Sequence, residues 1–187
     1  MNIPTLESDR LLLRAYAPED IEAFVTILSN PNAVQYLPMS EPWPREIVEK
    51  WLLSSRSHWL QEGFGWWILE HKDAARAIGW CGLRRLENTG EVEVLYLLAE
   101  EYWGHGLATE AARHSIEYGF HSVGLDEIIG LVLEENIASS RVLEKSGLRF
   151  WQRATYFGFE CLKYRIDRSD FARSYAVDQQ DTAGFRS

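Results

Sequence analysis

The stretch from residue 91 to residue 112 constrains the fold of this chain more than any other. Residues 91–98 are β-branched, aromatic or leucine except for Glu91 and Glu93, and this composition predicts a strand. Gly104 and Gly106 follow, and glycine lets the backbone turn sharply and lets a ligand approach it closely. From residue 107 to residue 120, apolar and small side chains recur at helical spacing. The stretch therefore predicts a strand, a tight turn and a helix in series.

The start of this helix is a candidate anion site. Its first amides have no partner within the helix, and the helix dipole adds partial positive charge there. A phosphate group binds readily at such an end. A Gly-x-Gly sequence before a helix can also be a turn without a ligand. The flanking strand and helix, together with a second motif at Asn136, favour the binding site.

Length and composition indicate one globular domain. The chain has 187 residues, of which 46% are hydrophobic and 13% aromatic, which suits a sizeable core. We expect the domain to cover residues 1–166 and residues 167–187 to form a polar tail. No apolar run is long enough to span a bilayer, and the first residues lack a signal-peptide pattern. The expected location is therefore the cytoplasm, with no membrane partner.

The formal net charge of −9 narrows the possible partners. With 28 acidic and 19 basic residues, the surface is expected to repel nucleic acids and to favour a cationic substrate such as an amine. Cys81 and Cys161 form no disulfide framework and lack metal-ligand spacing, so we expect them to be small buried residues. The histidines are not clustered either, and the sequence predicts no metal site.

The other elements follow from hydrophobic periodicity and from the positions of glycine and proline. Strands are expected at residues 10–16, 66–70, 77–84, 127–133, 148–155 and 159–166. Helices are expected from residues 17–20 to a stop at residues 30–32, at residues 45–61 and at residues 137–146. The strands on either side of the helix after Gly106 should be parallel, through a right-handed crossover. The expected fold class is α/β: a mixed, mostly antiparallel central sheet with helices on both faces.

Four segments, taken in order, resemble one known family. They are residues 6–14, residues 78–84, residues 93–112 with Tyr-Trp-Gly-His-Gly-Leu-Ala-Thr-Glu-Ala at their centre, and residues 134–148. Together they resemble the GCN5-related N-acetyltransferases (GNAT), and the first two resemble the branch that includes the ribosomal-protein-alanine acetyltransferases. The resemblance covers about residues 6–166. It implies the GNAT fold, in which the parallel central strands splay apart, and acetyl-CoA as the co-substrate.

The resemblance also implies which residues hold acetyl-CoA. In this family, main-chain amides of the glycine turn bind the pyrophosphate, and the pantetheine arm lies along the central strand. Carried over, the turn residues are Trp103, Gly104, His105, Gly106, Leu107, Ala108 and Thr109, and the strand residues are Leu97, Leu98 and Ala99. Asn136, the expected N-cap of the short helix, and Ser139 would lie near the pantetheine or the thioester. Where the family usually has Arg or Gln, this chain has Glu101, which cannot donate to phosphate when ionised.

Glu93 and Ser139 are the candidates for the chemistry. An alkylamine, with a pKa near ~10, must lose a proton to attack a thioester, and Glu93 is the candidate general base if burial raises its pKa. Glu91, one pleat further out on the same face, is the reserve candidate. In the related branch, the position of Ser139 can protonate the departing thiolate. Many family members have a tyrosine where this chain has Leu143, so the acid is Ser139 or water, or no strong acid is needed.

The sequence thus predicts an N-acetyltransferase that moves an acetyl group from acetyl-CoA to a primary amine by direct attack in a ternary complex. The amine is a small molecule or a protein N-terminus, and the chain is a monomer or a homodimer. A ping-pong route through Cys81 or Cys161 lacks a visible activating base. One alternative is a non-catalytic acyl-CoA-binding regulatory module, which Glu101 and Leu143 support. The other is a nucleotide-binding protein, which the absence of a long Gly-x-Gly-x-x-Gly pattern and of a P-loop lysine opposes.

Overall fold

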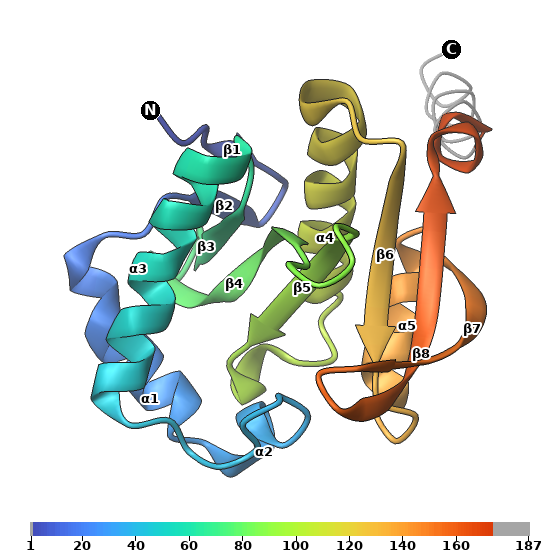
Figure 1. Cartoon of the computed structure of the whole chain (residues 1–187). Coiled ribbons are helices and arrows are strands. Elements are labelled where there is room, and N and C mark those ends of the chain that lie inside the picture. The colour runs from blue at the N-terminus through green and yellow to red at the C-terminus, as the bar shows by residue number, and fades with distance from the viewer. Residues whose placement is uncertain (1, 174–187) are drawn as a thin grey trace.

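One mixed sheet dominates the computed structural model, which describes residues 2–173 (Figure 1). Its strands lie in the order β1-β2-β3-β4-β5-β6-β8-β7. The strands are β1 (Leu6–Glu7), β2 (Leu11–Arg14), β3 (Trp66–His71), β4 (Arg76–Arg85), β5 (Val92–Leu98), β6 (Glu127–Val132), β7 (Arg149–Tyr156) and β8 (Phe159–Asp167). Neighbouring strands are antiparallel except for β5 and β6, which run parallel. The predicted fold class is confirmed.

Helices connect the strands at the points where the chain changes direction. They are α1 (Ile21–Leu28), α2 (Pro31–Val34), α3 (Arg45–Glu62), α4 (Leu107–Tyr118) and α5 (Ile137–Lys145). Short 3-10 turns occur at Pro18–Asp20 and Glu100–Tyr102, and a wider π-type turn at Gly119–Val123 follows α4. Within residues 2–173, none of the helices combines the length and apolarity needed to cross a bilayer.

The helices cover both faces of the sheet. Figure 1 shows α1 and α3 on one face and α4 and α5 on the other. Under α4, the buried Ala111 packs with Val94 of β5 in one apolar cluster, and its small side chain lets the helix lie close to the sheet. On the opposite face, Phe24 of α1, Leu52 of α3 and Trp80 of β4 belong to a second buried cluster. The sheet is therefore the shared wall of two cores.

The parallel pair at the centre of the sheet is short. β5 pairs with β4 along its whole length, but it pairs with β6 at one position, Glu93 opposite Ile129. Beyond this point the two strands diverge toward their C-terminal ends (Figure 1). The main chain of β5 is therefore left without a strand partner on that side. The predicted splay of the central strands is confirmed.

The structure differs from the predicted elements near the two ends of the chain. Asn30 does not simply stop α1, because its side chain accepts a hydrogen bond from the Asn32 amide at 2.9 Å and caps the additional helix α2. Strand β1, which pairs with β2, has no counterpart in the prediction. Residues 168–173 are helical, and the ring of Phe171 stacks on Phe120 with centroids 4.7 Å apart. The rest of the expected tail, residues 174–187, lies outside the described residues.

Candidate active site

A cleft of about 680 Å³ opens where β5 and β6 diverge. It is lined by β5, the glycine turn, the first turns of α4 and α5, the tip of the β7–β8 hairpin and the segment between α2 and α3. The predicted site residues that line it are Glu93, Leu97, Leu98, Trp103, Gly104, Gly106, Leu107, Ala108, Thr109, Asn136 and Ser139. Ala99 and His105 are not among the lining residues. The fold thus gathers most of the predicted site from four separate segments.

The glycine turn presents free amides to one end of this cleft. Gly104 and Gly106 have φ values of +77° and +80°, a left-handed conformation that glycine adopts without steric cost. No side chain caps α4, so the amides at its first positions, Leu107, Ala108 and Thr109, have no helical partner. Together with the helix dipole, these amides are suited to bind an anion.

The main-chain groups of β5 face two directions. The carbonyl of Leu97 faces β4, because a Cβ built on Gly79 would lie 2.0 Å from its oxygen. Main-chain groups alternate along an antiparallel strand, so those of Leu98 and Tyr96 face the side that β6 leaves open. The Trp103 indole already donates to the Leu98 carbonyl at 2.8 Å and joins the glycine turn to the end of the strand. Of the predicted strand residues, Leu98 therefore has main-chain groups on the cleft side, whereas the Leu97 carbonyl faces β4 and the Ala99 amide donates to the Ile78 carbonyl of β4.

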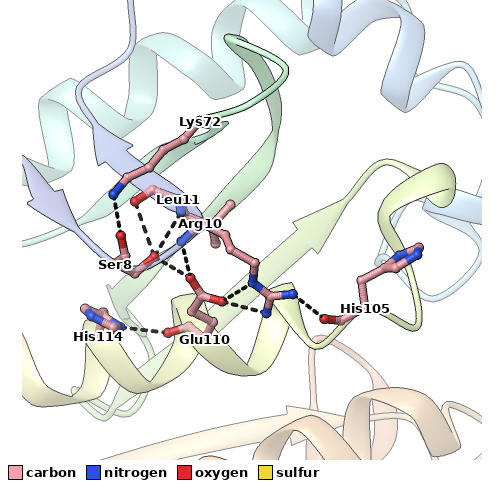
Figure 2. Close-up of polar contacts among 7 residues, drawn as sticks. All are labelled: Ser8, Arg10, Leu11, Lys72, His105, Glu110 and His114. Atoms are coloured by element: carbon pink, nitrogen blue, oxygen red, sulfur yellow. Dashed lines mark hydrogen bonds and ion pairs between the residues drawn. The ribbon is translucent and has the colours of Figure 1, made fainter.

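Arg10, from the N-terminal segment, holds the glycine turn (Figure 2). Its Nη1 donates to the His105 carbonyl at 2.8 Å, and its Nε donates to Glu110 Oε2 at 2.8 Å. Glu110 lies in the first turn of α4 and also accepts from the Arg10 amide at 2.9 Å and from Ser8 Oγ at 2.6 Å. Burial alone would raise the pKa of Glu110, but the hydrogen bonds from Ser8 and Arg10 hold it below its ordinary value. We refer to Ser8, Arg10 and Glu110 as the N-terminal clamp.

Glu101 occupies the position where the family usually has arginine or glutamine. Among the described residues, its side chain forms no hydrogen bond with the glycine turn. It forms an ion pair with Arg76 at 2.7 Å, and both side chains are largely exposed. A cation does reach the turn from elsewhere, since the Arg10 guanidinium bonds the His105 carbonyl. The departure at Glu101 therefore leaves the free amides of the turn unaffected.

Glu93 lies at the point where β5 and β6 separate, and only 5% of its surface is exposed. Arg84, directly opposite on β4, donates to Glu93 Oε1 through Nε at 2.7 Å and also through Nη2. Oε2 accepts no hydrogen bond from any described residue. Burial raises the pKa of Glu93, the Arg84 charge lowers it, and the net result lies above the ordinary value. Such a carboxylate, with one free oxygen beside a cleft, is suited to accept a proton.

Glu91 lies in a different environment. Its Oε2 accepts from Tyr156 Oη at 2.6 Å, and its Oε1 is paired with Lys163 Nζ. Burial alone would raise the pKa of Glu91, but the hydrogen bonds from Lys163 and Tyr156 hold it below its ordinary value. Glu91 does not line the cleft. The geometry therefore favours Glu93 over Glu91 as the proton acceptor.

Ser139, in the first turn of α5, forms a pair with Tyr96 of β5. The two hydroxyl oxygens lie 2.8 Å apart, and Tyr96 Oη also donates to the Ser139 carbonyl at 3.0 Å. Asn136 caps this helix, as expected, by accepting from the Ser139 amide at 3.1 Å. Burial raises the pKa of Tyr96, so its hydroxyl keeps its proton. The pair places two hydroxyl groups on the wall of the cleft.

Leu143 is a core residue of α5. It is 1% exposed, and a Cβ on Gly130 of β6 would lie 2.5 Å from its side chain. A larger side chain at position 143 would have to displace β6, because interiors are close-packed. The leucine is therefore explained by packing against the strand.

Comparisons with known proteins agree with this architecture. The sequence model of the acetyltransferase (GNAT) domain matches residues 10–149. This chain belongs to the GNAT acetyltransferase family. The uncharacterized protein YkkB of Bacillus subtilis is 31% identical over 80% of this chain and 88% of its own length, and the uncharacterized N-acetyltransferase YoaA of the same organism is 29% identical over 78% and 83%. The crystal structure of an acetyltransferase from Agrobacterium tumefaciens superposes with a TM-score of 0.80 at 26% identity, over 90% of this chain and 96% of that one.

As a GNAT acetyltransferase, the chain is an acetyl-CoA-dependent enzyme that acetylates nitrogen. The residues present fit this co-substrate on two structural grounds. The uncapped amides of α4 suit a pyrophosphate, and the open edge of β5 suits the amide groups of a pantetheine arm. Acetyl-CoA supplies the thioester that carries the acetyl group.

Reasoning from the sequence did not single out Arg10, Arg84 and Tyr96 as site residues of this GNAT enzyme. Arg84 is within reach of sequence reasoning, because the register of an antiparallel hairpin places it opposite Glu93. Arg10 meets the glycine turn across 95 residues, and Tyr96 meets Ser139 across 43 residues. No local pattern reports such contacts.

Proposed function

We propose that this enzyme transfers the acetyl group to a primary amine by direct attack of the amine nitrogen on the thioester carbonyl, in a ternary complex. The observation that carries the proposal is Glu93, a buried carboxylate with a raised pKa and a free oxygen at the fork of the two central strands. An ammonium group has no lone pair, so the acceptor must lose a proton before it attacks.

The roles of this chain's groups follow from their positions. Amides of residues 103–109 hold the pyrophosphate, and the open edge of β5 around Leu98 holds the pantetheine. Glu93 accepts the proton from the amine, directly or through water. The nitrogen then forms a bond to the carbonyl carbon, and the carbon–sulfur bond breaks. Ser139, which is hydrogen-bonded to Tyr96, gives its proton to the departing thiolate and recovers one from the nitrogen, which loses its second proton as the amide forms. Glu93 returns its proton to water, and the products are the N-acetylated acceptor and CoA.

The cysteines do not support a covalent acetyl-enzyme. Cys81 is completely buried, and burial raises the pKa of its thiol to about 12. Burial also raises the pKa of Cys161 above its ordinary value. A nucleophilic cysteine needs a lowered pKa or an adjacent base. The ternary route therefore remains our proposal, together with a cytoplasmic location and a monomer or homodimer, which are predictions from the sequence.

A comparison of Glu93→Gln with Glu91→Gln tests the proposal. The two glutamates lie on the same face of the same segment, and glutamine keeps an oxygen that can accept from Arg84. We expect Glu93→Gln to bind acetyl-CoA as the unaltered enzyme does in calorimetry and to lose roughly 100-fold or more in amine-dependent thiol release. Glu91→Gln should keep its turnover.

Three results would count against the proposal in different ways. Equal turnover in Glu93→Gln and the unaltered enzyme would remove Glu93 from the mechanism. Acetyl-CoA binding without thiol release for any amine would support the non-catalytic regulatory module. Labelled acetyl retained on the protein after gel filtration, in the absence of amine, would support a covalent route.

A further inference from the structure

The cleft has an aromatic wall beside Glu93, formed by Trp43, Trp51 and Phe157, with the buried Trp80 behind them. The three indole rings contact one another: the centroids of Trp43 and Trp51 are 5.9 Å apart, those of Trp43 and Trp80 are 6.3 Å apart, and those of Trp51 and Trp80 are 5.4 Å apart. Trp80 lies four residues before Arg84 on β4, so its side chain is on the same face of the sheet as the Arg84–Glu93 pair. The wall is thus adjacent to the proposed base.

The residues that line this cleft are not predominantly acidic, although the whole chain has a net negative charge. The net charge is −9, yet among the described residues that line the cleft Glu93 is the one carboxylate, and Arg84 already neutralises it. The Arg84 guanidinium also lies over the rings of Trp51 and Phe157, at 5.9 and 5.3 Å from their centroids. These ring faces therefore already hold a cation. The other charged lining residues, Arg141 and Lys145 of α5, are basic.

We propose that the acceptor is a primary monoamine with a flat apolar body, which stacks on the aromatic wall while its amino group reaches Glu93. This inference rests on the proposed function and names its substrate class. Aromatic rings bury large apolar areas and favour offset-stacked or edge contacts with other rings. The net negative charge of the whole chain led us to expect a cationic substrate from the sequence. The residues that line the cleft do not share this negative charge.

Two other classes of amine fit this lining less well. A polyamine or an aminoglycoside would bring several ammonium groups into a site with one carboxylate that is already paired, and a buried ion without a partner is costly. A peptide N-terminus would bring main-chain amides that need hydrogen-bond partners. The aromatic wall offers mostly rings: the Trp43 indole N–H already donates to the Met39 carbonyl, and the buried Trp51 indole N–H is a single donor without a partner in the described structure.

The test compares acceptors on the full chain. Phenethylamine and tryptamine represent the proposed class, spermidine and kanamycin represent polycations, and a tetrapeptide with an N-terminal alanine represents protein N-termini. We would measure thiol release at saturating acetyl-CoA and, separately, calorimetric binding of each amine to the protein–CoA complex. We expect kcat/KM for the aromatic monoamines to exceed that for spermidine by about tenfold or more, a ratio within reach of apolar pocket contacts.

The two readouts separate this inference from the proposed function. Aromatic monoamines that bind the CoA complex but are not acetylated would support the acceptor class and overturn the transfer proposal. Turnover or binding that favours spermidine, kanamycin or the peptide would overturn the acceptor class while leaving acetyl transfer intact. If none of the amines binds the CoA complex, the acceptor class is wrong.

Phe157→Ala and Phe150→Ala form a matched pair for the aromatic wall. Both phenylalanines are about half exposed, at 52% and 53%, but only Phe157 lines the cleft. We expect Phe157→Ala to raise KM for phenethylamine by about tenfold, with an unchanged Kd for CoA, and Phe150→Ala to leave both values unchanged. We also expect Phe157→Glu to raise kcat/KM for spermidine, because it adds a carboxylate to the wall. An unchanged KM in Phe157→Ala would contradict the stacking role.

Discussion

Two opposing influences set the charge of Glu93. Burial disfavours the ionised form of Glu93, and the Arg84 guanidinium favours it. The effect of burial on the pKa is the larger of the two. Removal of Arg84 would leave burial unopposed and would raise the pKa of Glu93 further. Because the base acts only when deprotonated, the activity should then require a higher pH.

Arg84→Met tests this at the scale of one residue. Methionine keeps much of the apolar stem but not the charge. We therefore expect the ascending limb of the plot of kcat/KM against pH to shift to higher pH by about one pH unit or more. Arg85→Met is the control, because Arg85 is the next residue on β4 but pairs with Glu62 at 2.5 Å. An ascending limb at the same pH in both variants would show that Glu93 is not the group that titrates.

Ser139 supports a second prediction at this scale. Its hydroxyl lies 2.8 Å from Tyr96 Oη, and a thiol is acidic enough that its thiolate leaves without strong assistance. We therefore expect Ser139→Ala and Tyr96→Phe each to lower kcat by about tenfold, with little change in KM for acetyl-CoA. Ser140→Ala is the control, because the neighbouring Ser140 hydroxyl is buried and has no hydrogen-bond partner in the described structure. A larger loss in Ser140→Ala than in Ser139→Ala would indicate a packing effect.

At the scale of elements, the turn between β5 and α4 depends on the N-terminal clamp. Arg10 ties the His105 carbonyl to Glu110, so it fixes the turn through a residue that does not line the cleft. The same residue joins the N-terminal segment to the turn and to the first turn of α4 (Figure 2). We therefore expect the clamp to position the main-chain amides of the proposed anion site.

Arg10→Ala should therefore weaken the binding of CoA, although it removes none of the main-chain amides that are predicted to bind the pyrophosphate. We expect Kd for CoA to rise about tenfold, equivalent to about 1.4 kcal/mol, with partial recovery in Arg10→Lys and an unchanged kcat at saturating acetyl-CoA. Arg45→Ala is the matched control, because Arg45 is exposed to the same extent and pairs with Glu22 and Glu49, but bonds neither the turn nor the clamp. If Arg45→Ala weakens CoA binding equally, general surface charge rather than the clamp explains the loss.

The elements differ in how far the sequence specifies them. The glycine turn and the Asn136 cap follow from local signals, since glycine and cap residues act over a few residues. The parallel pair β5–β6 follows from the crossover rule once the helix between the two strands is predicted. The short helix α2 does not, because Asn30 serves equally well as a stop signal and as a cap. The different environments of Glu91 and Glu93 cannot be predicted from the sequence, because they depend on long-range contacts. The fold brings Lys163 to Glu91 and places Glu93 beside the cleft.

For the whole molecule, three carboxylates that the fold partly or fully buries affect stability in opposite directions. Glu110 and Glu91 have pKa values below the ordinary value, so their stabilising contribution is complete above the unfolded-state pKa of about 4.3 and is lost as the pH falls through their folded-state values. Glu93 has a raised pKa, so the folded state holds its proton more tightly than the unfolded state does. Its effect appears as the pH rises above about 4.3, and it destabilises the fold at neutral pH.

Urea unfolding of Glu93→Gln and Glu110→Gln at pH 7 and at pH 4 should reveal these opposite signs. At pH 7 we expect Glu110→Gln to be less stable than the unaltered chain, because glutamine keeps the shape but loses the charge that Arg10 binds. Glu93→Gln should gain stability relative to the unaltered chain on going from pH 4 to pH 7, since it removes a carboxylate that ionises at a cost. Both changes should stay within about 2 kcal/mol, as is usual for single substitutions. A Glu93→Gln variant that loses stability over the same pH interval would mean that the pairing with Arg84 outweighs burial. In that case Glu93 would be a structural ion pair rather than a carboxylate kept ready to accept a proton.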